Sequence, residues 1–131
     1  MTALVVAKFG GTSVADFDAM NRSADVVLSD ANVRVVVLSA SAGVTNLLVA
    51  LAEGLEPAER QAKLEAIRAI QYAVLERLAN PAVIRDEIER LLENLGTLAE
   101  AASLATSTAL TDELVSHGEL MSTLLFVEIL R

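Results

Sequence analysis

The chain has 131 residues, 53% of them hydrophobic and only 3% aromatic, so it fits one domain or part of one with an aliphatic core. Its formal net charge of −8 disfavours nonspecific binding to nucleic acid, because contacts to phosphates need lysine and arginine. The sequence contains no cysteine, which excludes disulfides and thiolate metal sites.

The amino-terminal residues do not have the pattern of a secretory signal, because Lys8 and Asp16 interrupt the apolar residues there. Residues 35–52 carry no charge and could be mistaken for a membrane span. Small and polar residues occupy the middle of this stretch, so a strand, a turn and a helix are the better interpretation. We therefore expect a cytoplasmic protein that binds neither membranes nor nucleic acid.

The first predicted element is a strand over residues 4–7, which ends at the hexapeptide Lys-Phe-Gly-Gly-Thr-Ser of residues 8–13. Glycines have no Cβ, so Gly10 and Gly11 allow the backbone to turn sharply and bring its N–H groups close to an anion. A helical pattern follows from about Val14, and the N-terminus of that helix would add a partial positive charge at the same place. The hexapeptide therefore predicts a phosphate-binding loop.

Lys8 adds a full positive charge to this loop and is the candidate catalytic residue, acting on phosphoryl oxygens. Gly10 and Gly11 would offer backbone donors to the same phosphates, and Ser13 is a weaker candidate. The order of residues differs from the Walker loop, in which the lysine follows the glycines, and the G-x-G-x-x-G fingerprint is absent. A tight turn that binds nothing is the alternative interpretation of the glycine pair.

A second strand is predicted over residues 33–38, a β-branched run typical of strands buried on both faces. Small and polar residues follow at 39–46, and another helical pattern begins at Leu47. In open parallel sheets, ligands bind where the carboxyl ends of strands meet the following helices. Both loops fall at such ends, which favours a binding site, although Ser39 and Thr45 could merely fill a turn and cap a helix.

The rest of the chain is predicted to be helical. The pattern over residues 18–28 is amphipathic, with Asp16 as a plausible cap. Pro57 suits the first turn of a helix that runs to about Leu78, where Asn80-Pro81 should break it.

Two further helices are predicted beyond this break. The first carries an apolar stripe over residues 84–102 with a period close to 3.5, which indicates packing on a neighbouring helix or, as the alternative, a dimer seam. The second is predicted to be capped by Thr111, with Asp112 and Glu113 placed favourably for its dipole.

That last helix carries a third motif, Ser-His-Gly-Glu at residues 116–119. Glu119 lies on one helix face with Ser116 and Thr123, which makes a small polar stripe. Gly118 costs helix stability, so we expect it to serve a close approach of backbone or ligand. His117 is expected to be structural. From the residues alone, Glu119 is more simply a surface glutamate than a ligand-binding group.

The three motifs together resemble the aspartokinase family: residues 8–13, the sequence Leu-Ser-Ala-Ser-Ala-Gly-Val-Thr-Asn at 38–46, and residues 116–119. The intervening sequence, such as Ala-Asp-Phe-Asp-Ala-Met at 15–20, is most similar to the lysine-sensitive, single-function branch of enteric bacteria. The resemblance covers the whole chain. The wider amino acid kinase superfamily shares a lysine and glycines at this strand end, whereas the full hexapeptide points to aspartokinase.

The resemblance implies an α/β fold, the amino-terminal part of the three-layer αβα (carbamate kinase-like) amino acid kinase fold. It also implies ATP-dependent phosphorylation of the side-chain carboxylate of L-aspartate, the first step of lysine, threonine and methionine biosynthesis. The site residues that it implies bind phosphate or ATP (Lys8, Gly10, Gly11, Ser13 and Ser39) or aspartate (Thr45 and Glu119). Mg²⁺ is expected with the ATP, although no dedicated metal-binding cluster is apparent in this sequence.

Aspartokinases are several hundred residues long, so residues 1–131 would be only the amino-terminal portion of the catalytic domain. The later Gly-Arg-Gly-Gly-Ser-Asp segment, most of the nucleotide-binding half and the regulatory ACT domains have no counterpart here, and the chain ends at Arg131 within a helical pattern. We expect this portion to be inactive alone and to form a homo-oligomer, because a partial sheet leaves an open edge. The alternatives are another amino acid kinase and a non-catalytic helical fragment that self-associates through residues 84–102.

Overall fold

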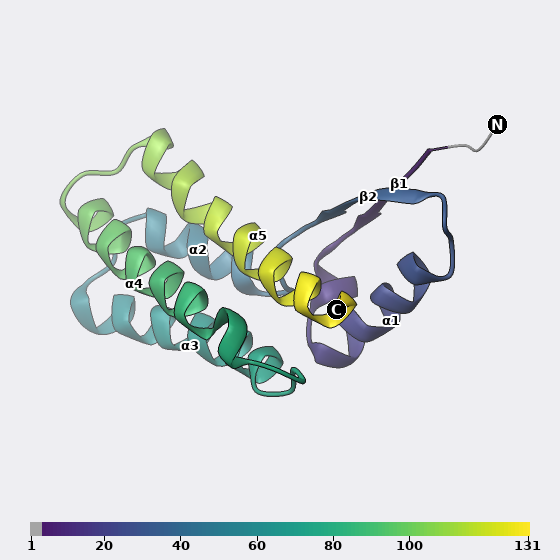
Figure 1. The fold of residues 1–131 in the computed structure, drawn as a ribbon. Helices are drawn as coiled ribbons and strands as arrows, with labels where there is room; N and C mark the ends of the chain where they lie inside the picture. Colours follow the sequence, from purple (N-terminus) through teal and green to yellow (C-terminus); the bar gives the residue numbers. More distant parts are fainter. Residues whose placement is uncertain (1–3) are drawn as a thin grey trace.

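The computed structural model describes residues 4–131. In chain order the elements are β1 (Val5–Phe9), a 3-10 turn η1 (Gly11–Val14), α1 (Phe17–Leu28), β2 (Val33–Leu38), α2 (Val44–Ala52), α3 (Pro57–Leu75), α4 (Ala82–Leu104) and α5 (Thr108–Leu130). Figure 1 shows the two strands and α1 at one end of the molecule and the bundle of α2, α3, α4 and α5 at the other. Helix α5 runs from the bundle to α1 and so joins the two ends. The α/β prediction is confirmed.

The two strands are parallel, with a shift of register between Val5 and Val6, and Lys8 lies opposite Val37. Phe9, Val36 and Leu38 pack against the core, and the Phe9 ring lies 6.1 Å from that of Phe126 on α5. On the other face, Val37 is 45% exposed. The prediction that residues 33–38 are buried on both faces is therefore wrong for this structure, because within residues 4–131 only one face of the sheet is covered.

Helix α1 begins later than the sequence suggested. Asp16 has an extended backbone, and its side chain accepts a hydrogen bond of 2.8 Å from the Ala19 amide, which confirms it as the cap. Residues 11–14 form the separate 3-10 turn instead of the first turn of this helix. The prediction of a helix from Val14 is thus wrong, because the extended backbone of Asp16 interrupts the helical conformation and its side chain caps α1 at Phe17.

The bundle follows the predicted pattern closely. Pro57 occupies the first turn of α3, and Pro81 precedes α4. The apolar stripe of α4 packs against α2, α3 and α5, so the packing interpretation is confirmed and this stripe is not an exposed seam. Its buried members are Ile84, Ile88, Leu91, Leu92, Leu95, Ala99 and Ala102.

Helix α5 begins at Thr108, and the predicted cap at Thr111 is wrong. The Ser107 side chain accepts from the Leu110 amide at 3.1 Å, and the Thr111 hydroxyl donates back to the Ser107 carbonyl. Several hydroxyl residues lie around this start, and Ser107, which has an extended backbone, takes the cap. Within the described chain, none of the helices has the length and apolar character needed to cross a membrane.

Candidate active site

The two loops that follow β1 and β2 meet at one edge of the sheet, as the sequence predicted. The Ser39 amide donates to the Phe9 carbonyl at 3.1 Å, and the Ala42 amide donates to the Gly11 carbonyl at 3.1 Å. The ladder of the sheet thus continues past the ends of both strands. Because of these bonds, the Lys-Phe-Gly-Gly-Thr-Ser loop and the small-residue loop form one continuous surface.

The two glycines of the first loop have different roles. A Cβ at Gly11 would lie 3.1 Å from the Ala40 carbonyl oxygen and 3.5 Å from the Ala42 backbone nitrogen. Gly11 is therefore needed for the contact between the loops. A Cβ at Gly10 would meet nothing within 4 Å, so its surroundings leave open space for a ligand to approach.

The helix end next to these loops belongs to α2. Asp16 already caps α1, and this removes the reason for expecting the dipole of α1 at the glycine pair. Helix α2 starts at Val44, directly after the second loop, with Gly43 at φ +89° and no side-chain cap. Thr45 lies in its first turn and is exposed. The predicted start of this helix at Leu47 is wrong by three residues, and it placed Thr45 in the loop instead of in the helix.

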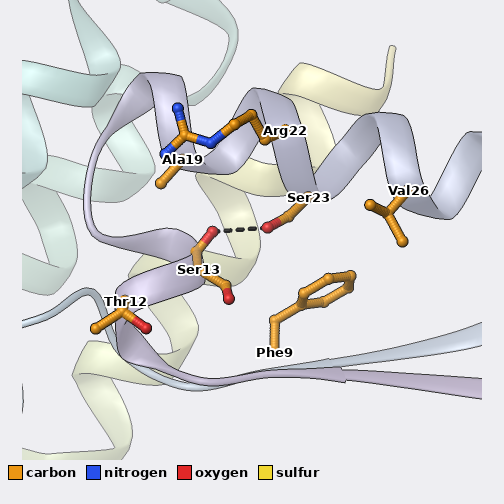
Figure 2. Close-up of a pocket in the computed structure, with 7 residues that line it drawn as sticks. All are labelled: Phe9, Thr12, Ser13, Ala19, Arg22, Ser23 and Val26. Carbon is orange, nitrogen blue, oxygen red and sulfur yellow. Dashed lines mark hydrogen bonds between the residues drawn. The ribbon is translucent and has the colours of Figure 1, made fainter.

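Lys8 lies near the carboxyl end of β1 and is exposed. Further along, the Ser13 carbonyl accepts a hydrogen bond of 2.8 Å from the Ser23 hydroxyl of α1, as Figure 2 shows. This bond fixes the turn η1 against α1. The two elements and Phe9 line a hollow of about 280 Å³, and Arg22, which the sequence did not single out, lies at its wall.

Glu119 lines a cleft of about 550 Å³ between β2 and α5. The cleft is lined by Val36, Val37, Leu38, Ser116, Glu119, Leu120 and Thr123. The polar stripe predicted on α5 is therefore present on the side of the cleft. The cleft is lined by β2, and β1, which carries Lys8, pairs directly with β2.

Close packing of α5 on the second loop brings Glu119 to this place. A Cβ at Gly118 would lie 2.8 Å from the Ala40 Cβ and 3.0 Å from the Leu48 Cδ1, so only glycine allows this approach. The expected close approach at Gly118 is present, but it is made by side-chain carbons and not by backbone or ligand atoms. Four residues further along the helix, the Ser122 hydroxyl donates to the Ser39 carbonyl at 2.7 Å.

His117 faces away from this cleft and is only 5% exposed. Its Nδ1 lies 2.8 Å from the Glu113 carbonyl oxygen, one turn earlier on α5. The residues around it include Asn94 and Thr97 of α4, so the side chain sits at a contact between helices. This placement agrees with the expectation of a structural role.

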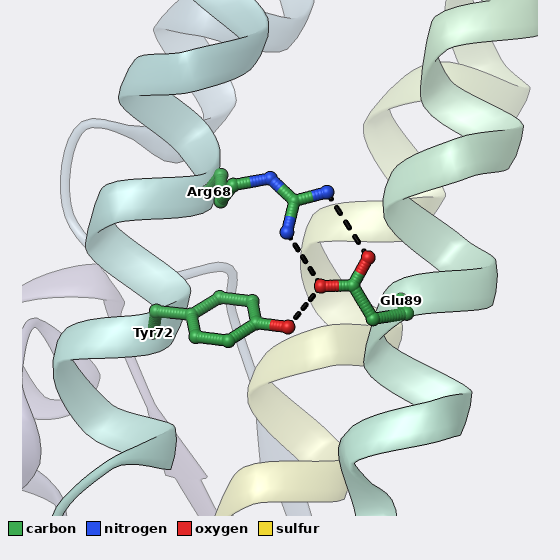
Figure 3. A network of polar contacts seen from close by, with 3 residues as sticks. All are labelled: Arg68, Tyr72 and Glu89. Atoms are coloured by element: carbon green, nitrogen blue, oxygen red, sulfur yellow. Dashed lines mark hydrogen bonds and ion pairs between the residues drawn. The ribbon is translucent and has the colours of Figure 1, made fainter.

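Arg68 and Tyr72 of α3 and Glu89 of α4 form a polar contact between the two helices, away from the two loops (Figure 3). Hydrogen bonds from Arg68, and then from Tyr72, hold the pKa of Glu89 below its usual range. Burial, and then the bond to Glu89, raises the pKa of Tyr72. This network ties two helices of the bundle together and has no part in the candidate site.

Residues 4–131 contain no group of three or more histidine, cysteine, aspartate or glutamate side chains placed to hold a metal ion. The two loops instead offer one lysine, glycines, hydroxyl side chains and one asparagine as polar or ligand-approachable groups. Such residues fit a phosphate better than a divalent cation.

Comparison with known proteins gives the family context of this site. The family model described as "Amino acid kinase family" matches residues 3–131. The chain is 82% identical over 131 residues to lysine-sensitive aspartokinase 3 of Escherichia coli, covering 100% of this chain and 29% of that protein. It is 34% identical over 128 residues to the chloroplastic aspartokinase 1 of Arabidopsis thaliana, covering 92% of this chain and 22% of that protein.

Solved structures of E. coli aspartokinase III match the fold. The structure with aspartate and ADP (R-state) has a TM-score of 0.96 and 84% identity, covering 98% of this chain and 29% of that one. The structure with lysine and aspartate (T-state) matches with the same TM-score of 0.96. The chain thus spans less than a third of the length of these relatives.

Proposed function

The chain belongs to the amino acid kinase family, and from this premise we propose that it is the amino-terminal part of an aspartate kinase. Such an enzyme transfers the terminal phosphoryl group of ATP to the side-chain carboxylate of L-aspartate and forms aspartyl phosphate. The 82% identity to an aspartokinase over the whole chain supports this substrate. The observation that carries the proposal is the junction of the two loops, with Lys8 on one side and the Glu119 cleft on the other.

The site must bind two negatively charged substrates and stabilise a negatively charged transition state. Aspartate and ATP are both anionic, and the transferred phosphoryl group passes through a loose transition state with negative charge on its oxygens. Catalysis therefore needs positioning and positive charge more than covalent chemistry. We assign Lys8 to the phosphoryl oxygens, with backbone N–H donors at Gly10 and Gly11 and a lesser contact from Ser13.

Aspartate would lie between the second loop and α5. Thr45 is exposed in the first turn of α2, which no side chain caps and where the helix dipole favours a carboxylate. Glu119 would hold the α-ammonium group by a charge-assisted hydrogen bond. Ser39 would line the pocket where the phosphoryl group and the aspartate side chain meet.

Mg²⁺ would come with the ATP, bound to its phosphates, where it offsets their charge. The described residues do not supply a metal cage of their own, so we assign no protein ligand to it here. Most contacts to the nucleotide would come from the remainder of the catalytic domain.

We propose that residues 1–131 form the amino-terminal portion of that domain, with the regulatory ACT domains elsewhere in the protein. The uncovered face of the two-stranded sheet, where Val6 is 62% and Val35 is 49% exposed, supports a further layer of the same domain. We further propose a cytoplasmic homo-oligomer, and that the isolated portion is inactive.

The test is ATP-dependent phosphorylation of aspartate by the complete gene product and by its Lys8→Ala variant. We expect kcat to fall by at least about 10²-fold, with a much smaller effect on aspartate binding, because the lysine acts on developing charge. Lys63, on α3, is the other lysine of the sequence, and Lys63→Ala is the matched control that should retain activity. An unchanged kcat in Lys8→Ala would refute the assignment. Activity on acetylglutamate or carbamate but not on aspartate would favour another amino acid kinase.

A further inference from the structure

Ser122 on α5 lies between two of the residues assigned to the substrate site. Its hydroxyl oxygen is 2.7 Å from the carbonyl oxygen of Ser39 and 3.1 Å from that of Glu119. The residue is completely buried. Ser39 and Glu119 are far apart in the chain, so this one hydroxyl bridges the second loop and the helix that carries the carboxylate.

Of the two contacts of the Ser122 hydroxyl, the one to the Ser39 carbonyl is the shorter. The Glu119 carbonyl also accepts from the Thr123 hydroxyl at 2.7 Å, so it does not depend on Ser122. The Ser39 carbonyl, in contrast, is reached from a different element 83 residues away. Loss of the Ser122 hydroxyl would leave the loop carbonyl without this donor in a half-buried position, and the loop would move to regain one.

The surrounding packing makes this bond the point at which the loop and the helix are held in register. Gly118, one turn earlier, allows α5 to approach the Ala40 Cβ. On the same loop, the amide of Ser39 is bonded to the Phe9 carbonyl. Ser39 is therefore held from β1 through its amide and from α5 through its carbonyl.

We propose that Ser122 is a positioning residue for aspartate, fixing the separation between the Ser39–Thr45 loop and the Glu119 carboxylate. This inference rests on the proposed function. An amino acid held at one end by hydroxyl and amide donors and at the other by a carboxylate requires a fixed distance between them. A small misplacement of such groups weakens binding without any loss of a direct contact.

The experiment measures KM for aspartate, KM for ATP and the thermal midpoint in the complete gene product and three variants. Ser122→Ala should raise KM for aspartate about tenfold, since it removes a buried hydrogen bond, and change KM for ATP by about twofold or less. Ser122→Thr keeps the hydroxyl donor and should stay within about threefold of the unsubstituted protein in KM for aspartate. Ser103→Ala removes a hydroxyl whose partner among residues 4–131 is the Glu100 carbonyl of the same helix, and should leave both constants unchanged.

The KM values and the thermal midpoint together separate a positioning role of Ser122 from a purely structural one. A lowered thermal midpoint in Ser122→Ala with both KM values unchanged would mean that the serine serves only stability, and would overturn the inference. An equal rise in both KM values would overturn it too, because the effect would not be specific to aspartate. If Ser122→Thr is too unstable to assay because of its added methyl group, direct calorimetric titration of Ser122→Ala with aspartate decides alone. Failure of the unsubstituted protein to phosphorylate aspartate would instead reject the proposed function.

Discussion

Replacing each of two helical glycines by alanine should have opposite effects on stability. In both helices alanine is favoured over glycine by about 1 kcal/mol. At Gly96 of α4 a Cβ would meet nothing within 4 Å, so Gly96→Ala should stabilise the fold by up to about 1 kcal/mol.

At Gly118 of α5 the same substitution produces a steric clash with the second loop and α2. The new Cβ would lie 2.8 Å from the Ala40 Cβ, 3.0 Å from the Leu48 Cδ1 and 3.2 Å from the Val44 Cγ1. Carbon atoms in contact prefer about 3.5–4.0 Å, so α5 and the second loop must separate by up to about 1 Å. Overpacking of this kind costs about 1–3 kcal/mol, and after subtraction of the helix preference Gly118→Ala should destabilise by about 1 kcal/mol.

The assay is urea unfolding followed by circular dichroism for both variants and the unsubstituted chain. The helix preference cancels between the two variants, so their difference of about 2 kcal/mol measures the overpacking alone. Gly118→Ala should also lower activity on aspartate in the complete gene product, because the cleft between β2 and α5 would widen. Equal stabilities of Gly96→Ala and Gly118→Ala would refute the close approach on which the site depends.

Two further predictions concern the bundle. Glu89→Gln should lower stability at pH 7 by less than about 1 kcal/mol, because the ion pair with Arg68 is substantially exposed. Because the folded-state pKa of Glu89 is lowered, the stability that its carboxylate contributes is present above the ordinary carboxyl pKa of about 4.3 and is lost as the pH falls below it. The unfolding curves of Glu89→Gln and of the unsubstituted chain should therefore converge below about pH 4. Gln71 is completely buried, and neither atom of its side-chain amide has a hydrogen-bond partner within the described residues. Gln71→Met should therefore increase the free energy of unfolding by about 1 kcal/mol, measured by urea unfolding. A decrease would show that the amide is satisfied.

Local signals in the sequence were sufficient for most elements of the fold. The β-branched run at residues 33–38 became β2 with the predicted bounds, and Pro57 starts α3. Asp16 caps α1 as expected. In each case the residue acts on its own neighbours in the chain, through backbone preference or a cap, so no knowledge of distant contacts is needed.

Besides the start of α1, which was placed too early at Val14, the starts of α2 and α5 were missed. A run of hydroxyl residues precedes α5, and the choice of Ser107 over Thr111 depends on which residue takes an extended backbone. Similarly, α2 starts at Val44 because Gly43 adopts a positive φ, which permits an earlier turn than the small-residue pattern indicated. This second error matters for function, because it moves Thr45 from a loop to the uncapped end of a helix.

The assembly of the candidate site could be predicted only in part. Strand topology places both loops at one sheet edge, and that much follows from sequence. The position of Glu119 beside them depends on Gly118 and Ser122, whose contacts lie on a loop some eighty positions earlier in the chain. A glycine or a serine inside a helix does not indicate its distant partner. The residues that recognise a ligand can therefore be read from their chemistry, whereas the residues that set the distances between them become visible only once the chain is folded.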